Sequence, residues 1–321
     1  MGTAEPRVSI LLAVYHPRMD WLRLQLDSLN AQTWPNLELL VCDDGPDAPV
    51  DENVFREHVT AFPWRLLRNE KNLGSNRTFE KLTLLAEGDY LCYCDQDDIW
   101  LPEKTARLME TLRSEKAGLV CSDMYIIDGA GKKIADSITK IRRHHIFRSG
   151  TGLTDTLWYS NFASGCALLA DAALAKAAVP FNPHMYYDHY VTLFAANAGR
   201  VISLREPLLY HREHGGNQSS TLQGVHDRES YYRIRVETPV KAVNWLCEHF
   251  PADEKLGKTL GQGKEWLEAR LAYGKGERKR RRTIWEYRRF SPMASLFEIL
   301  LPYMPAPLMK LSFWLSRKNL I

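Results

Sequence analysis

Short apolar runs alternate with stretches whose apolar positions recur every three or four residues along the first two thirds of the chain. The short runs are typical of buried strands, and the three-to-four spacing is typical of helices that bury one face. The predicted strands are 8–15, 37–42, 64–68, 90–94 and 119–123, and the predicted helices between them are 21–32, 76–86 and 102–115. This alternation predicts an α/β fold, with a mixed, mostly parallel, Rossmann-like sheet flanked by helices.

The pattern is less regular after residue 125. An apolar segment at 163–170, a helix at 188–198 and strands at 201–204 and 207–210 are expected to complete the same domain. After residue 221 the pattern becomes helical and basic, with no repeat or low-complexity linker. We therefore expect a first domain over 1–221, with halves of about 1–125 and 126–221, and a helical, basic and amphipathic region over 222–321.

Carboxylates follow two of the predicted strands. Asp43 and Asp44 follow the strand at 37–42, and Asp95-Gln96-Asp97-Asp98 follows the strand at 90–94. Ligands of open α/β sheets bind beyond the carboxyl ends of the strands, so these acidic ends are expected to converge on one edge. There Asp95 and Asp97 offer the oxygen ligands that Mg²⁺ or Mn²⁺ prefers, and such a cation offsets charge on a departing diphosphate. The alternative is a solvated acidic turn that caps the helix starting near Pro102, with Asp98 in its N-terminal turn.

Composition narrows the classes of protein. The net charge of +3 over 321 residues is too small to imply a general affinity for nucleic acid. The six cysteines form neither a CxxC pair nor a disulfide framework, which favours a reducing cytoplasm. The N-terminus lacks a signal-peptide cleavage site and no stretch reaches roughly 18 uninterrupted apolar residues, so we expect a soluble or peripheral protein. No GxGxxG follows the first strand, which disfavours a dehydrogenase.

Several longer motifs occur in a characteristic order: SLNAQTWPNLELLVCDDG, NEKNLGSNRTFEKL, EGDYLCYCDQDDIWLPEK, SGCALLA, YYDHYVTLFAANAG and YHREHGGNQS. Over residues 8–220 they resemble the GT-A fold, family-2 inverting glycosyltransferases. DQDDIWLPEK and YHREHGGN look most like the rhamnosyltransferase-type branch that builds bacterial surface polysaccharides. The resemblance implies metal-dependent, inverting transfer of a sugar, L-rhamnose in that branch, from a dTDP- or UDP-linked donor to a saccharide hydroxyl.

The resemblance also implies roles for individual residues. Asp44, with Val14 and Tyr15, would hold the nucleotide base, although Asp43 and Asp44 could equally form a turn with Gly45. The implied donor contacts are Val14, Tyr15, Asp44, Asn72, Gly74, Arg77, Asp95, Arg212 and His214, and the implied ligands of Mn²⁺ or Mg²⁺ are Asp95, Asp97 and His214. Pro46 stands where the family often has serine, outside these contacts. Gly215 and Gly216 would let the loop close over the donor.

Asp188 is the implied catalytic base, because it lies at the start of a helix downstream of SGCALLA. A carboxylate there would remove the proton of the attacking acceptor hydroxyl. The alternative is that Asp188 is only the N-cap of its helix. His211 and His214 raise the alternative of a zinc site, which is disfavoured because a loop fixes no ligand spacing and no cysteine is near.

Other functions and contacts stay open. A nucleotidyltransferase fits less well, because no glycine-rich, basic signature follows the first strand, and intact acidic residues argue against a non-catalytic saccharide-binding relative. Trp158, Tyr159 and Asn161 would either stack on acceptor sugars or pack in the core. His144 and His145 belong to a basic loop that is either solvated or in contact with acceptor phosphate.

The C-terminal region combines cations with apolar residues. The segment 275–290 places cations beside Trp285 and Tyr287, and apolar residues recur at helical spacing through 293–301 and again at 308–315. Such a segment is typical of a helix lying in a membrane interface, so we expect a peripheral protein on the inner face of the plasma membrane. A polyprenyl-diphosphate-linked acceptor would suit that place. The alternative is that these helices pack on the catalytic domain or form a homo-oligomer interface.

Overall fold

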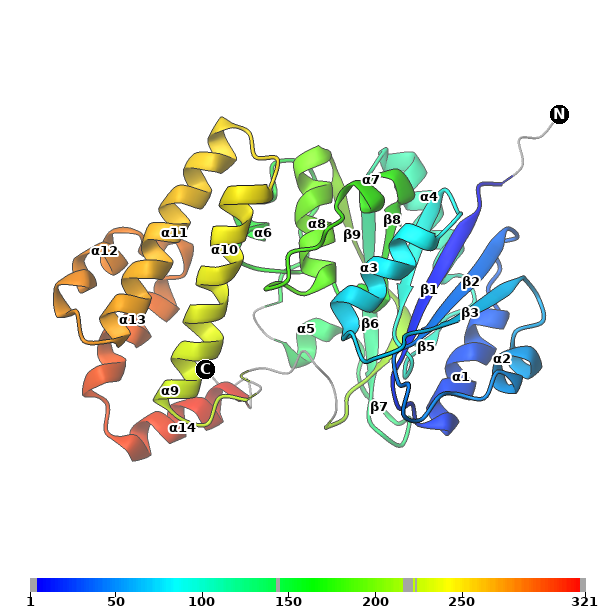
Figure 1. The fold of residues 1–321 in the computed structure, drawn as a ribbon, viewed down its shortest axis with the longest axis horizontal. Coiled ribbons are helices and arrows are strands. Elements are labelled where there is room, and N and C mark those ends of the chain that lie inside the picture. Colours follow the sequence, from blue (N-terminus) through cyan, green and yellow to red (C-terminus); the bar gives the residue numbers. More distant parts are fainter. Residues whose placement is uncertain (1–4, 143–144, 216–221, 223, 318–321) are drawn as a thin grey trace. The chain divides into compact units, whose positions relative to one another are not determined.

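The computed structural model describes residues 5–142, 145–215, 222 and 224–317 (Figure 1). The chain divides into two compact units, Met1–Phe181 with Tyr186–His214 and Asn182–Met185 with Gly215–Ile321. The domain boundary predicted after residue 221 stays a prediction, because residue 221 lies outside the described residues.

A single sheet forms the centre of the first unit, and within the described residues it has nine strands. The strands are β1 (Val8–Val14), β2 (Leu37–Asp43), β3 (Trp64–Arg68), β4 (Tyr90–Cys94), β5 (Ile99–Trp100), β6 (Leu119–Ile127), β7 (Lys133–Ala135), β8 (Leu168–Asp171) and β9 (Val201–Arg212). Their order is β3-β2-β1-β4-β8-β6-β9-β5, with β7 beside β6. Strands β1 to β4, β6 and β9 run in one direction, and β5, β7 and β8 run in the other. The predicted mixed, mostly parallel sheet is confirmed.

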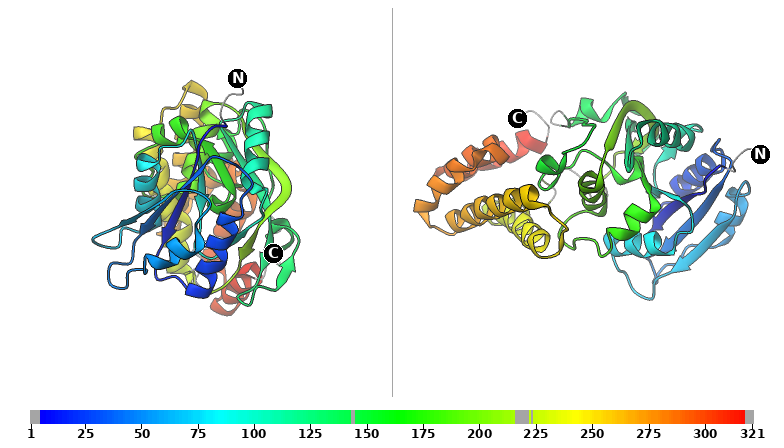
Figure 2. Two further views of the ribbon diagram at one scale, coloured as in Figure 1. Left: turned by 90° about the vertical axis from the view of Figure 1, so that its right-hand side faces the viewer. Right: turned by 90° about the horizontal axis from the view of Figure 1, so that it is seen from above.

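Helices cover both faces of this sheet, as Figures 1 and 2 show. One face carries α1 (Met19–Asn30), α2 (Asn53–His58) and α4 (Lys104–Glu115), and the other carries α3 (Ser75–Leu85), α7 (Ala172–Ala177) and α8 (Tyr187–Ala198). The shorter elements are α5 (Ile138–Ile141), α6 (Thr154–Leu157) and the 3₁₀ turn η1 (Gly165–Ala167). Because both faces are covered, β1 and β2 are buried almost throughout, which explains their continuous apolar runs.

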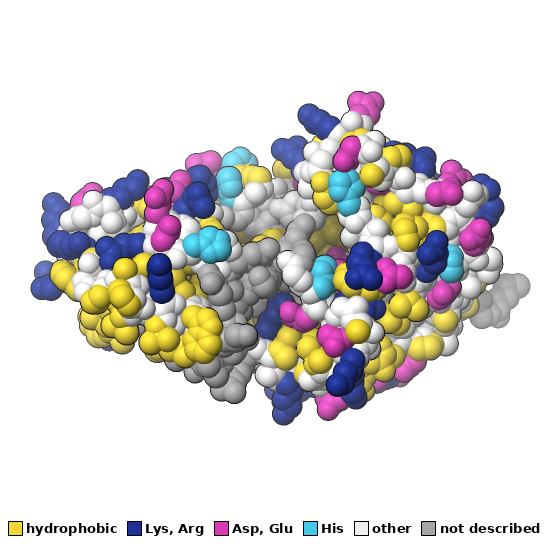
Figure 3. Space-filling view, turned by 90° about the horizontal axis from the view of Figure 1, so that it is seen from below, with side chains coloured by type: hydrophobic (Ala, Val, Ile, Leu, Met, Phe, Trp, Pro, Cys, Tyr) yellow, Lys and Arg dark blue, Asp and Glu magenta, His cyan; other side chains and the backbone are white. Residues whose placement is uncertain are grey.

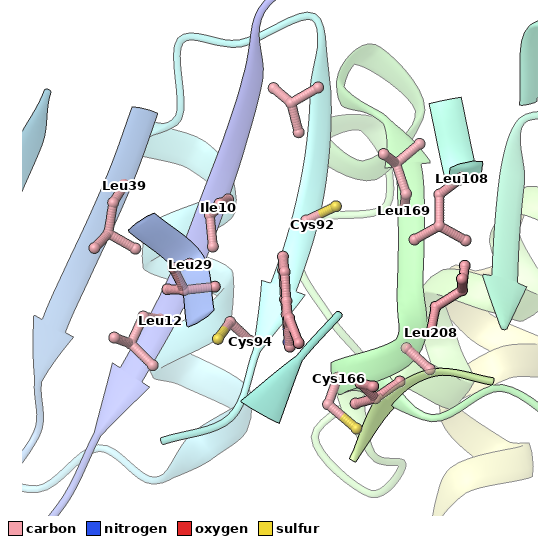
Figure 4. Close-up of a cluster of buried hydrophobic side chains, with 14 of the residues drawn as sticks. Ile10, Leu12, Leu29, Leu39, Cys92, Cys94, Leu108, Cys166, Leu169 and Leu208 are labelled. Atoms are coloured by element: carbon pink, nitrogen blue, oxygen red, sulfur yellow. The ribbon is translucent and has the colours of Figure 1, made fainter. Parts of the chain in front are cut away.

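The core of the first unit lies between the sheet and α1, α2 and α4. Ile10, Leu12 and Leu39 point from β1 and β2 toward this layer, where Leu29 of α1 joins them (Figure 4). Leu108 of α4 packs farther along the same face. This core fixes the strand ends that carry the acidic residues.

The structure differs from the sequence prediction in the second half of the sheet. The strands expected at 201–204 and 207–210 are one strand, β9, whose register against β6 shifts at Pro207. Proline has no N–H for the ladder, and the two residues before it are accommodated as a bulge. In the apolar segment at 163–170, η1 covers Gly165–Ala167 and the strand β8 begins only at Leu168. Several short elements, β5, β7, α2 and α7, were not predicted because they contain too few residues to show a period.

The second unit is helical, as expected for the C-terminal region. Its elements are α9 (Arg228–Tyr232), the π turn η2 (Arg233–Glu237), α10 (Thr238–His249), α11 (Glu254–Gly274), η3 (Arg278–Arg280), α12 (Arg281–Glu286), η4 (Arg288–Phe290), α13 (Pro292–Leu300), η5 (Leu301–Tyr303) and α14 (Ala306–Arg317). A buried Arg270 pairs with Glu298, Nε to Oε2 at 2.7 Å, and Tyr231 donates to the same carboxylate at 2.9 Å. Within the described chain, none of the helices has the length and apolar character needed to cross a bilayer.

Candidate active site

The turn between β4 and β5 gathers negative charge. Asp95 and Asp97 are partly exposed there, and Asp98 is fully buried. Burial, together with the charges of Asp98 and Asp97, raises the pKa of Asp95 to about 8. Burial and Asp98 also raise the pKa of Asp97. These carboxylates therefore lie in an environment that favours a nearby cation.

His214 meets this turn from the end of β9. Its Nε2 lies 2.7 Å from Oδ2 of Asp97, and its ring lies 4.9 Å from the ring of Trp21. The structure thus brings together two of the three ligands that the sequence predicts, from segments 117 residues apart. Gly216 of the same motif lies outside the described residues, so the predicted loop closure stays a prediction.

A buried trio that sequence reasoning missed lies beside the acidic turn. Asp98 Oδ1 accepts from Nδ1 of His211 at 3.0 Å, and Sγ of Cys166 lies 3.8 Å from the same nitrogen. Burial works against both charges, yet His211 holds the pKa of Asp98 below its usual value, and Asp98 raises the pKa of His211 to about 9. The two form a buried ion pair that fixes β9 against the turn.

One alternative and one expectation that concern this trio need correction. Asp98 is not in the first turn of a helix, because α4 begins only at Lys104 and Asp98 immediately precedes β5. The expectation that no cysteine lies near the histidines is also wrong, because the fold brings Cys166 to His211, and the ligand atoms of the trio all lie within 4.8 Å. No sequence spacing could show this, since the three residues lie in three separate segments.

Arg212 is buried, with 1% of its surface exposed. Its Nε donates to the carbonyl of Asp97 at 2.9 Å, its Nη1 donates to the carbonyl of Asp128 at 3.2 Å, and its guanidinium lies over Trp21. The geometry shows a residue that positions the backbone of Asp97. The predicted diphosphate contact of Arg212 stays a prediction.

Backbone N–H groups surround the carboxylates at the end of β2. Asp43 accepts from the N–H groups of Gly45 at 3.0 Å and Val50 at 2.8 Å. Asp44 accepts from Asn69 Nδ2 at 2.7 Å and from two backbone N–H groups of the next loop. Asp43 is therefore held by donors of its own loop, and Asp44 by donors of the loop between β3 and α3.

The loop held by Asp44 contains the other predicted nucleotide contacts. Its donors to Asp44 are the N–H groups of Leu73 and Gly74, each at 2.8 Å. Gly74 has φ of 79°, a conformation that favours glycine, and it directly precedes α3. Asn72 donates weakly to the Asp44 carbonyl at 3.4 Å, and Arg77 is exposed on the first turn of α3. Asp44 thus shapes this loop, and its predicted contact with a base is untested.

Gln96, the middle residue of Asp95-Gln96-Asp97, joins two strand ends. Its Oε1 accepts from the Tyr15 N–H at 2.8 Å and its Nε2 donates to the Tyr15 carbonyl at 3.1 Å. The Tyr15 ring is 47% exposed and stacks on His16 at 4.1 Å. Val14 has a buried side chain, and its carbonyl accepts from the Asp44 N–H at 2.8 Å. The ends of β1, β2 and β4 are thereby fastened to one another.

Asp188 lies in the first turn of α8, but it is not the N-cap, which is Tyr186. Its Oδ2 accepts from the Gly165 N–H at 3.0 Å and its Oδ1 from the His189 N–H at 2.6 Å. Burial raises the pKa of Asp188 to about 6, and the charge of Asp188 in turn raises the pKa of Asp95. The two carboxylates therefore belong to one electrostatic site.

Gly165 and Tyr187 explain why η1 meets α8 so closely. A Cβ on Gly165 would fall 1.9 Å from the Tyr187 hydroxyl oxygen, so a larger residue could not occupy this position without a shift. Tyr187 also packs on Phe79 of α3, and its N–H donates to Asn76 Oδ1 at 2.9 Å. This contact places the N–H of Gly165 against Asp188.

The remaining candidates are distributed differently. Trp158 is buried in the core, whereas Tyr159 and Asn161 are partly exposed. His145 is half-buried, and burial together with Arg142 lowers its pKa. His144 lies outside the described residues. Their predicted acceptor contacts are untested.

Comparisons with known proteins give a family, several relatives and a shared fold. The family model described as Glycosyl transferase family 2 matches residues 9–176. A glycosyltransferase of Nostoc sp. is 23% identical over 244 residues, 74% of each chain. The abequosyltransferase RfbV of Salmonella typhimurium is 30% identical over 160 residues, which is 48% of this chain and 44% of the relative. The solved structure of S. aureus TarS 1–349 in complex with UDP-GlcNAc covers 98% of this chain and 90% of its own, with a TM-score of 0.57 and 15% identity, and it shows the same GT-A fold.

Proposed function

Because the chain belongs to glycosyl transferase family 2, we propose that this glycosyltransferase moves a sugar from a nucleotide diphosphate to a saccharide hydroxyl, with inversion at the anomeric carbon. The observation that carries the proposal is the shared electrostatic site of Asp95, Asp97 and Asp188: burial raises the pKa of all three carboxyls, and the negative charges of Asp97 and Asp188 add to the rise at Asp95. A cation at Asp95 and Asp97 would relieve the repulsion, and Asp188 would remain free to accept a proton.

The residues present fit a hard divalent cation. Asp95 and Asp97 supply carboxylate oxygens and His214 lies 2.7 Å from Asp97, so these three would hold Mn²⁺ or Mg²⁺. When bound, the cation offsets the charge of a departing diphosphate. Arg212 would keep the Asp97 backbone in place through its hydrogen bond to the carbonyl.

Asp188 would act as the general base. With a pKa of about 6 it is mostly ionised at neutral pH, and two backbone N–H groups hold its oxygens in place. The acceptor oxygen would bond to the anomeric carbon while the bond from that carbon to the diphosphate oxygen breaks. The proton of the acceptor hydroxyl would pass to Asp188, and the released nucleoside diphosphate would carry the electron pair.

The nucleotide would lie along the ends of β1 and β2. The exposed Tyr15 ring and the Val14 backbone would face the base with Asp44, and Asn72, Gly74 and Arg77 would contact the ribose or the phosphates. UDP-GlcNAc is the ligand in the TarS complex, which supports a UDP- or dTDP-linked donor. The likeness of DQDDIWLPEK and YHREHGGN to rhamnosyltransferases supports L-rhamnose as the sugar. The acceptor would be a saccharide of a surface polysaccharide, carried on polyprenyl diphosphate at the cytoplasmic face of the plasma membrane.

A thermal-shift screen of nucleotide sugars, with and without Mn²⁺ or Mg²⁺, tests this proposal, because a ligand that binds the native state raises its Tm. We expect a dTDP- or UDP-linked sugar to raise Tm more in the presence of metal, and Asp97→Ala to lose the metal-dependent part. A shift with nucleoside triphosphates alone would indicate a nucleotidyltransferase and contradict the proposal. Binding without hydrolysis or transfer of the donor would indicate a non-catalytic relative.

A further inference from the structure

Helices α13 and α14 each carry apolar residues on two faces. One face packs inward, where Phe297 of α13 and Met309 and Phe313 of α14 belong to one apolar cluster, and Phe313 stacks on Tyr231 of α9 at 5.6 Å. The other positions are exposed and form what we call the outer apolar surface: Met293, Leu296, Leu300, Tyr303, Leu308, Leu311 and Trp314. Within α13 and within α14 these positions are three or four residues apart, so each helix carries one exposed apolar stripe, and Tyr303 lies in η5 between them.

A helix that packs on one side of a protein core needs a single apolar stripe. The outer apolar surface is therefore additional to the packing of the second unit. Figure 3 shows hydrophobic side chains gathered at the left end of the molecule, with lysine and arginine side chains beside them. Clustered exposed apolar groups of this kind mark an interaction surface.

Positive charge adjoins this surface. From Lys275 to Arg289 the chain has eight basic and two acidic residues, and all eight basic side chains are exposed. The Arg278 guanidinium lies 5.4 Å from the ring of Tyr303, within the outer apolar surface, and Arg288 lies 4.6 Å from Trp285. Helix α12, which carries Arg281 and Arg282, packs against α13.

We propose that the outer apolar surface and the cations of 278–289 dock the enzyme on an anionic lipid bilayer. The apolar side chains would enter the acyl boundary while the guanidinium groups meet the headgroup phosphates. Charge selects the bilayer over a second copy of the chain, because a symmetric dimer would set the same cations against one another.

The benefit of membrane docking rests on the proposed function. An enzyme and a lipid-linked acceptor on the same membrane surface meet more often than two molecules in solution. Flotation requires no donor sugar, so it reports docking whether or not transfer is observed. A failure of docking and a failure of the proposed reaction are therefore distinguishable.

The test is flotation of the full chain with phosphatidylcholine vesicles, with and without phosphatidylglycerol. We expect recovery only with phosphatidylglycerol, and a drop of about tenfold when salt is raised well above physiological strength. Leu296→Gln with Leu300→Gln should lower recovery at least about fivefold, since glutamine keeps the helix but removes the apolar contact. Arg281→Gln with Arg282→Gln should lower recovery on the anionic vesicles by a similar factor.

The matched control is Leu84→Gln with Leu85→Gln on α3. Leu84 and Leu85 are 53% and 43% exposed, close to the 44% and 51% of Leu296 and Leu300. Equal losses in the two leucine pairs would overturn the proposal, as would recovery that does not depend on phosphatidylglycerol. A wild-type oligomer in light scattering that Leu296→Gln with Leu300→Gln converts to a monomer would also overturn it, because a second copy would then cover the surface.

Discussion

The two acidic strand ends on either side of β1 look alike in sequence but differ in their surroundings. At the end of β2, Asp43 and Asp44 accept hydrogen bonds from N–H groups of the loops that follow. At the end of β4, Asp95 and Asp97 face other carboxylates, and their pKa values are raised. Carboxylates at a strand end can therefore hold neighbouring loops in place or form a centre of negative charge. Hydrogen-bond donors of the neighbouring loops determine which of these two roles the carboxylates have.

The largest effect should come from Asp188, whose charge adds to the centre at β4. Asp188→Asn keeps the shape of the side chain but removes its basicity, so we expect turnover to fall by roughly 10²–10⁴. Donor and metal affinity, measured by thermal shift, should stay close to wild type. If nucleotide affinity fell as far as the rate, Asp188 would be a binding residue and not the base.

Asp97→Ala should lower transfer by roughly 10²–10³ at saturating Mn²⁺, because it removes a metal ligand where leaving-group charge develops. The protein should stay folded, since Asp97 is partly exposed and its removal leaves no core cavity. Asp136→Ala is the matched control, because Asp136 is an exposed carboxylate that forms an ion pair with Lys133. Wild-type turnover in Asp97→Ala would contradict the interpretation that the carboxylates at the end of β4 hold a catalytic cation.

The smallest effects are on stability, and they should have opposite signs at the two strand ends. Asp44→Asn places an amide NH₂ against backbone donors and should lower the free energy of unfolding by about 1–3 kcal/mol. Asp95→Asn should raise it in metal-free buffer, because the amide carries no charge to repel Asp97 and Asp98. The free energy of unfolding of each variant and of the wild type is measured by urea denaturation.

The gain in Asp95→Asn should depend on pH. A carboxyl whose pKa is raised to about 8 in the folded state destabilises that state increasingly as pH rises from its unfolded pKa toward 8. The advantage of Asp95→Asn should therefore grow from pH 6 to about pH 8 and level off above that pH. Destabilisation by both substitutions at pH 9 would show that the two strand ends are alike.

The sequence predicts the parts of the fold that repeat a pattern. Strands β3 and β4 occur at the predicted residues, and α8 begins one residue before the predicted position. The family resemblance correctly identified the glycosyltransferase family. Long buried strands and amphipathic helices give runs and periodic patterns that the sequence shows directly. The order of the motifs indicates the family.

The contacts between distant segments could not be predicted in this way. The Asp98–His211 pair joins residues 113 positions apart, and periodicity carries no information about such a pair. Val14 and Arg212 are the last residues of β1 and β9, yet the burial of a side chain there depends on neighbours that only the fold supplies, such as Trp21 beside Arg212. Sequence patterns locate a strand end, but they do not show which of its side chains face solvent.

The two hydrogen bonds between Gln96 and Tyr15 join the ends of β1 and β4, so that the two strand ends form one rigid unit. In the proposed site one end of this unit meets the base and the other holds the cation. Binding of a ligand at one strand end would order the backbone of both ends. The second ligand would then lose less conformational entropy when it binds. Thermodynamic reciprocity requires this cooperativity to be equal in both directions. The cation should therefore raise the affinity for a nucleoside that never contacts it, by the same factor by which the nucleoside raises the affinity for the cation.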